Sequence, residues 1–129
     1  MSKIFFGAFT LVFAVASLIY AVAPDVITTQ FAQMDITLGG GGVSYSGPQC
    51  RVWTSLAAAN VATLSLMCAM LYRDLRRFAA VRWPLLLMKG LSALLFTVWW
   101  IAWPGARSLG VAAAGDYATA VGIWYFSRV

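Results

Sequence analysis

The chain contains no histidine and no glutamate, and its acidic residues are four aspartates, Asp25, Asp35, Asp74 and Asp116. Most haem, copper, zinc and di-iron sites use imidazole or clustered carboxylates as ligands, so the composition excludes most such centres. It also excludes a pigment held through histidine, while ligation through a backbone carbonyl, an amide or water stays open. We therefore expect no metal, no cofactor and no enzymatic activity.

Cysteine is almost as scarce, with only Cys50 and Cys68 in 129 residues. Both belong to one predicted helix, where 18 positions at 1.5 Å per residue separate them by about 27 Å. That separation is several times the reach of a disulfide, and the chain has no C-x-x-C motif. Thiol–disulfide chemistry with a paired site is therefore excluded.

Charged residues make up only 10 % of the chain, whereas 62 % of its residues are hydrophobic. Soluble domains carry roughly a quarter charged residues, so this composition is typical of a membrane protein. The net charge of +5 does not indicate nucleic-acid binding. The cations lie at the ends of apolar runs, as the positive-inside rule predicts for membrane helices, rather than across one polar face.

Four apolar runs predict an all-α integral membrane protein, in which residues 1–129 form a single four-helix membrane domain. The expected spans are residues 4–23, 50–72, 84–103 and 108–127. Each run is close to the roughly 20 residues that a helix needs to cross a bilayer.

The first run has an alternative interpretation as a secretory signal, because Ala21-Val22-Ala23 resembles a cleavage site. The run is longer than the apolar core of a signal, and Pro24 follows the supposed cut. We therefore expect a retained span.

The segment 24–49 is the one long connection. Ile27, Phe31 and Met34 fall on one helical face, which predicts a short helix at the membrane surface. A run of four glycines at 39–42 follows, but it lacks the Lys-Ser/Thr of a phosphate-binding loop. It therefore predicts a turn with unusual backbone angles.

Orientation follows from a basic cytoplasmic turn at 73–83, which carries Arg73, Arg76, Arg77 and Arg82. Lys3 and Arg128 belong to the same side when there are four spans, whereas the other side receives only Arg51 and Arg107. The positive-inside rule then places both termini in the cytoplasm and the segment 24–49 outside, as in a bacterial inner membrane. We expect the basic residues to contact anionic lipids or an acidic partner.

The fourth run is weakly apolar and has Asp116 near its middle. Small residues recur at four-residue spacing and predict a ridge for helix packing: Gly110, Ala114, Ala118 and Gly122. Asp116 lies on nearly the opposite face, so both faces of this helix require protein neighbours. One neighbour is available within the chain, and the second face would be covered either by another subunit or by the closing of the four helices into one bundle.

Asp116 has two interpretations, a proton or cation carrier and a structural carboxyl hydrogen-bonded to Asn60 and Thr63 at similar depth. Lys89 is close enough to the inner interface to reach it, where it would contact a lipid head group. Its predicted depth is unfavourable for an ion pair with Asp116. A cluster of tryptophans marks the outer end of the third span and offers a contact surface: Trp99, Trp100 and Trp103.

Two functions remain open. One is a non-catalytic accessory subunit of a larger membrane assembly for energy conversion or transport, which packs and orients neighbouring subunits and lipids. The other is a small oligomeric transporter or channel that uses Asp116 for proton coupling. Small multidrug exporters have four helices and a similar length, but they depend on a glutamate in the first helix, which this chain lacks.

Overall fold

The computed structural model describes residues 1–41, 44–45 and 48–128, and the described part of the chain is helical, without strands. The elements in chain order are α1 (Ser2–Val22), α2 (Pro24–Thr37), α3 (Pro48–Arg73), the 3-10 turn η1 (Ala79–Val81), α4 (Arg82–Ala102) and α5 (Arg107–Phe126). The four long helices lie close to the predicted apolar runs, and α2 occupies the predicted short helix. The all-helical architecture is therefore confirmed.

Among the described residues, three helices are long and apolar enough to cross a membrane: Ser2–Val22, Cys50–Arg73 and Ala79–Ala102. Each has 21 to 24 residues, which corresponds to about 31 to 36 Å at 1.5 Å per residue and matches a hydrocarbon core of about 30 Å. α5 is not one of the three, and it contains Asp116 and three glycines, which lower its mean hydropathy. Three of the four expected spans therefore have the required length and apolarity, whereas α5 is less apolar than a membrane span requires.

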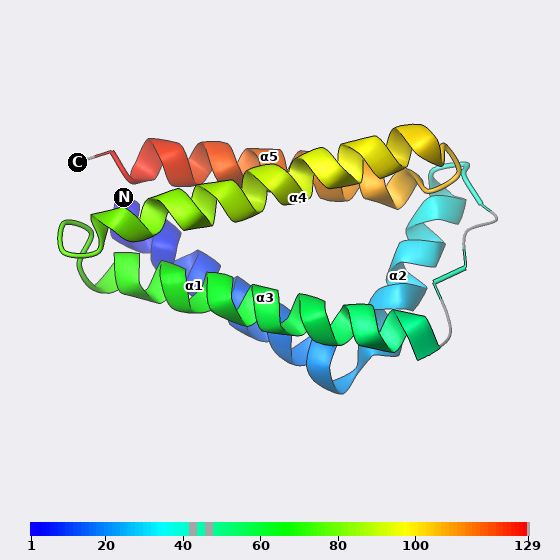
Figure 1. The fold of residues 1–129 in the computed structure, drawn as a ribbon, viewed down its shortest axis with the longest axis horizontal. Coiled ribbons are helices and arrows are strands. Elements are labelled where there is room, and N and C mark those ends of the chain that lie inside the picture. Colours follow the sequence, from blue (N-terminus) through cyan, green and yellow to red (C-terminus); the bar gives the residue numbers. More distant parts are fainter. Residues whose placement is uncertain (42–43, 46–47, 129) are drawn as a thin grey trace.

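The long helices form two antiparallel pairs, with α1 packed along α3 and α4 packed along α5 (Figure 1). The pairs lie closest at the end that holds both termini and the turn between α3 and α4, and they diverge toward α2. α2 crosses from the first pair to the second at the far end, where it contacts α1 and α5.

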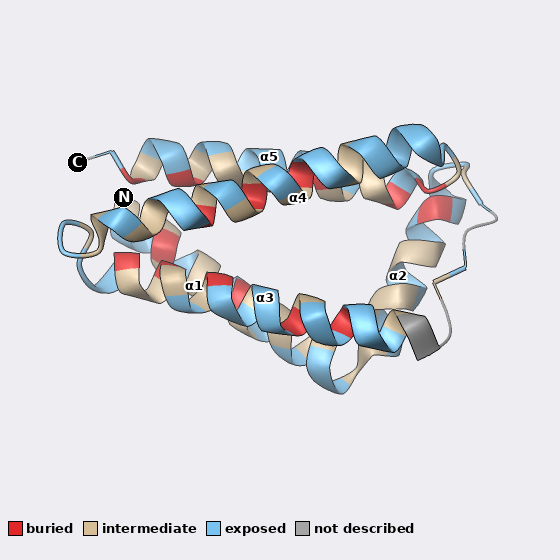
Figure 2. Cartoon of the chain, in the orientation of Figure 1, coloured by how far each residue is buried: buried red, intermediate tan, exposed pale blue. Residues whose placement is uncertain are grey.

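The hydrophobic core lies in the end where the pairs converge. Its buried members come from all four long helices: Phe6, Phe13, Leu64, Cys68, Leu71, Leu85 and Ile123. Phe5 of α1 stacks on Phe126 of α5 with ring centroids 4.6 Å apart and joins the two pairs there. Buried positions follow narrow lines along the helix contacts, and the outward faces are exposed (Figure 2).

Two hydroxyl groups connect α1 and α3 along their length. Ser17 donates to the carbonyl of Ala58, and Ser65 donates to the carbonyl of Thr10, at 2.9 and 2.8 Å. Small polar residues of this kind permit close helix approach and supply hydrogen bonds where water is absent.

The glycine run after α2 adopts the backbone angles that the sequence predicts, because Gly39 and Gly41 have φ of +74° and +153°; Gly42 lies outside the described residues. The Gly41 N–H donates to the carbonyl of Gly105 in the turn between α4 and α5, at 3.2 Å. A side chain on Gly40 would collide with that same carbonyl. The two turns therefore approach so closely that glycine is required on both sides.

Candidate functional site

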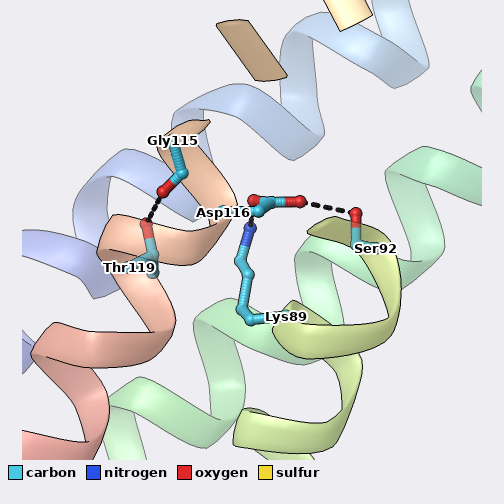
Figure 3. A network of polar contacts seen from close by, with 5 residues as sticks. All are labelled: Lys89, Ser92, Gly115, Asp116 and Thr119. Atoms are coloured by element: carbon cyan, nitrogen blue, oxygen red, sulfur yellow. Dashed lines mark hydrogen bonds and ion pairs between the residues drawn. The ribbon is translucent and has the colours of Figure 1, made fainter. Parts of the chain in front are cut away.

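A charged pair joins α4 to α5 in the middle of the second helix pair. The Nζ atom of Lys89 lies 2.6 Å from Oδ1 of Asp116, and the Ser92 hydroxyl donates to Oδ2. Lys89 and Ser92 are three residues apart, so both face α5 from one side of α4. Figure 3 shows the Asp116 carboxylate between these two side chains.

The ion pair overturns two sequence-based expectations. The sequence predicts a depth for Lys89 that is unfavourable for pairing with Asp116, but Lys89 lies seven residues into α4, about 10 Å, and Asp116 lies ten residues from the C-terminal end of α5, about 15 Å. The difference of about 5 Å is within the reach of a lysine side chain. The prediction is wrong because α4 begins at Arg82 rather than at residue 84, and because α5 packs along α4.

The proposed partners of Asp116 on α3 were also wrong. Asn60 is exposed, and the Thr63 hydroxyl donates to the carbonyl of Ala59 in its own helix. Both carboxylate oxygens of Asp116 are bound by α4 instead. Helix pairing, which places α5 against α4 rather than against α3, decides this outcome.

The pair is largely enclosed, because the Lys89 and Asp116 side chains keep only 11 % and 14 % of their exposure. The ammonium group also lies 4.8 Å from the centre of the Phe13 ring on α1, a cation–π contact that brings in a third helix. The two opposite charges compensate each other inside the second helix pair. Chemically, this arrangement holds helices together, since neither charge is left to bind a further ion.

The two ends of the small-residue ridge of α5 contact aromatic rings. A side chain at Gly110 would meet the Trp100 ring at 3.0 Å, and one at Gly122 would meet the Phe5 ring at 2.8 Å. Ala114 and Ala118, between them, are exposed. The face of α5 that packs on α4 includes Asp116 and the buried Ala113.

The basic turn lies at the end that holds both termini (Figure 1). The Asp74 carboxylate accepts hydrogen bonds from the backbone N–H groups of Arg76 and Arg77, so it closes the turn rather than pairing with a guanidinium. Three guanidiniums lie over neighbouring rings: Arg77 over Phe78, Arg82 over Trp83 and Arg128 over Trp124. Arg73, Arg76 and Arg77 are exposed. The Lys89–Asp116 contact is the one ion pair among the described residues, so this end keeps its positive charge.

The tryptophan cluster lies at the opposite end of α4. Trp99 and Trp103 stack with ring centroids 4.5 Å apart, and each of the three rings is about half exposed. Trp100 contacts Gly110 of α5.

A second polar cluster, which the sequence did not indicate, connects α2 to the start of α5. The Asp35 carboxylate is 2 % exposed, and it accepts hydrogen bonds from the Ser108 N–H at 2.6 Å and from the Tyr45 hydroxyl at 2.8 Å. No residue of α5 caps its own N-terminus through a side chain, so Asp35 supplies the missing acceptor from 73 residues away. Burial alone would raise the pKa of Asp35, but the hydrogen bonds from Ser108 and Tyr45 outweigh it and hold that pKa below its ordinary value.

Arg107 completes this connection, because its Nη1 donates to the carbonyl of Leu38 just after α2. No sequence pattern indicates these contacts, since local periodicity carries no information about partners about 70 residues apart.

No three His, Cys, Asp or Glu side chains gather into a metal-ligating group within the described ranges. Comparison of the chain with known protein families, with curated proteins and with solved structures finds no match. The chemistry of the residues is therefore the basis for any functional conclusion.

Proposed function

We propose that the chain is a non-catalytic accessory subunit of a larger membrane assembly, in which it packs and orients neighbouring subunits and lipids. In this proposal α5 is a fourth span, and both termini face the cytoplasm of a bacterium whose inner membrane holds the protein. The observation that carries the proposal is the internal compensation of the Lys89–Asp116 pair. A carboxylate bound by both a lysine and a serine of the neighbouring helix is suited to fastening helices, because releasing it for proton transport would leave Lys89 uncompensated.

The compensated charge also supports α5 as a span. A lone aspartate near the centre of a membrane helix costs about 3 kcal/mol on insertion scales. The lysine of α4 offsets that cost, and α5 runs alongside α4 (Figure 1). The two helices are therefore suited to entering the membrane as one hairpin.

The divergence of the helix pairs supports the presence of partner subunits. The buried hydrophobic core extends from the converging ends of the long helices to about their middle, at Phe13 and Leu64. Toward α2, large apolar side chains such as Leu56, Leu94 and Val98 remain about half exposed. The exposed Ala114 and Ala118 add a flat surface on which another helix packs closely, whereas lipid tails gain little from such small side chains.

The basic turn supports a contact with anionic lipids. Arg73, Arg76 and Arg77 are exposed, and the nearby Asp74 is engaged with the backbone. Each cation near an anionic membrane surface contributes roughly 1 kcal/mol of attraction, so three together hold this end firmly at the lipid head groups.

The test is extraction in mild detergent, followed by mass measurement of the particle and identification of the chains that co-purify. The accessory function predicts a stable particle with larger, unrelated subunits. An Ala118→Trp variant should release these subunits, whereas Leu11→Trp, at a position of α1 that is 69 % exposed, serves as the matched control.

A monomer or a homo-oligomer free of other chains would contradict the accessory function. Proton-coupled transport through Asp116 would then be the function to test, by measuring proton flux in vesicles with the wild type and with Asp116→Asn.

A further inference from the structure

A polar cavity of about 360 Å³ lies where α1 ends, α2 begins and α3 makes its first turns. It is open to the surface, and its volume is large enough to admit a small polar head group. The lining residues are Tyr20, Ala21, Val22, Pro24, Asp25, Arg51, Thr54 and Ser55. None of them takes part in the Lys89–Asp116 pair or in the Asp35 cluster.

The cavity is lined by one cation and one anion that form no direct ion pair with each other. Arg51 and Asp25 both line it and are exposed, yet the ion pair formed within the described ranges is the one between Lys89 and Asp116. Opposite charges that share a cavity without direct contact leave room for a ligand that carries both signs. A ligand with a single charge would be repelled by one of them.

Two hydroxyl groups of α3 line the cavity beside Arg51 and bond to its backbone carbonyl. The Thr54 and Ser55 side chains donate to the Arg51 carbonyl at 3.0 and 2.8 Å, and Thr54 is buried. Their hydrogens are thereby occupied, so toward the cavity these oxygens act as hydrogen-bond acceptors. The Tyr20 phenol on the opposite helix adds a group that both donates and accepts.

We propose that this cavity binds a phosphate ester that carries a primary ammonium group, the chemistry of phosphoethanolamine. A planar guanidinium such as that of Arg51 binds phosphate oxygens through two parallel hydrogen bonds. The Asp25 carboxylate and the hydroxyl oxygens accept the three ammonium hydrogens. The apolar edge made by Ala21, Val22 and Pro24 suits the carbon backbone of the ligand.

Two sources carry this chemistry, a phospholipid head group and a soluble phosphoethanolamine. The lipid source rests on the orientation proposed above, which places this end of α1 and α3 at the outer membrane interface. The soluble source needs no membrane. Neither source depends on partner subunits, so the accessory function and this site fail or succeed separately.

The experiment is native mass spectrometry of the full chain in detergent, titrated with three phospholipids of equal chain length and, separately, with soluble phosphoethanolamine. The phospholipids carry ethanolamine, glycerol or choline head groups. Glycerol lacks the ammonium, and choline lacks N–H donors. We expect the ethanolamine lipid to be retained about tenfold more strongly than either of the others, because only it combines the phosphate with N–H donors for the Asp25 carboxylate.

Three variants test the assignment of the charges. Arg51→Gln should lower retention of all three lipids by about tenfold, because each of them carries the phosphate. Asp25→Asn should reduce the ethanolamine preference to near parity. Thr63→Val is the matched control and should leave the preference unchanged, because the Thr63 hydroxyl donates to Ala59 in its own helix and does not line the cavity.

Displacement of the bound ethanolamine lipid by soluble phosphoethanolamine would support the site and show that the soluble compound binds without lipid chains. Retention of the lipid alone would support the site and assign the head group of a membrane lipid. Equal retention of the three lipids, or a Thr63→Val effect as large as that of Arg51→Gln, would overturn the proposal, because Arg51 and Asp25 would then be two solvated charges at the interface. Circular dichroism of each variant checks that the helices are intact.

Discussion

Removal of both members of the Lys89–Asp116 pair should cost less stability than the sum of the two single removals. The informative set comprises Lys89→Met, Asp116→Asn and the double variant. Methionine keeps the length of the lysine side chain without its charge, and asparagine keeps the shape of the aspartate and a bond to Ser92. The set therefore changes charge with little change in packing.

The burial of the pair determines how much stability is lost when one of the two charges is removed. Lys89 keeps 11 % and Asp116 14 % of side-chain exposure, so a charge left alone is poorly solvated. Breaking a buried ion pair in soluble proteins costs about 3–5 kcal/mol, and a central charge in a membrane helix costs about 3 kcal/mol.

The two single variants should differ in cost. We expect about 3 kcal/mol for Lys89→Met, because the short side chain of Asp116 cannot reach the interface. Asp116→Asn should cost about 2 kcal/mol, because the long side chain of Lys89 extends toward the head groups. The double variant should cost about 2 kcal/mol, so the coupling energy is about 3 kcal/mol.

The chain supplies its own reporter of unfolding. The Cys68 thiol is fully buried in the hydrophobic core, so a fluorogenic maleimide reaches it only when the helices separate. In a Cys50→Ser background, heating with this reagent gives the unfolding midpoint. A loss of 3 kcal/mol corresponds to a fall of about 10 °C for a chain of this size.

Thr119→Val is the matched control, because the Thr119 hydroxyl donates to Gly115 in its own helix, one turn from Asp116 (Figure 3). Its effect should stay within about 0.5 kcal/mol. A double variant whose cost equals the sum of the single costs would refute the reasoning, because the two side chains would then contribute independently.

Further predictions concern the connection between α2 and α5. Asp35→Asn should cost about 2 kcal/mol, since the buried Ser108 N–H loses a charged acceptor, and the same maleimide assay measures it. Because the folded-state pKa of Asp35 is lowered, the carboxylate stabilises the fold above the unfolded-state pKa of about 4, and this contribution is lost as pH falls through the folded pKa. The unfolding temperature of the wild type should therefore decrease when the pH is lowered below about 4, and that of Asp35→Asn should decrease less. An equal decrease in the two proteins would contradict the role of Asp35. Gly40→Ala should cost about 1–3 kcal/mol because its new methyl group meets the Gly105 carbonyl, whereas Gly90→Ala, with open space around it, should be neutral or stabilise α4 by up to about 1 kcal/mol.

The sequence alone determined the helices and the distribution of charge along them. Runs of apolar residues about 20 long predict helices from local composition, since backbone hydrogen bonds within lipid must be satisfied inside each segment. The same reasoning placed the turns, because proline, glycine and clustered arginines act locally. The left-handed backbone at Gly39 is one such prediction that the structure confirms.

Only the tertiary structure decided which helix faces lie against each other. Asp116 has the same helical surroundings in the sequence whether its partner is Asn60 or Lys89, and the pairing of α4 with α5 selects Lys89. The capping of α5 by Asp35 depends in the same way on how α2 crosses between the helix pairs. The periodicity of a sequence describes one helix at a time, whereas a contact between two helices depends on their register and separation. A small change in register or separation is enough to replace one polar partner by another.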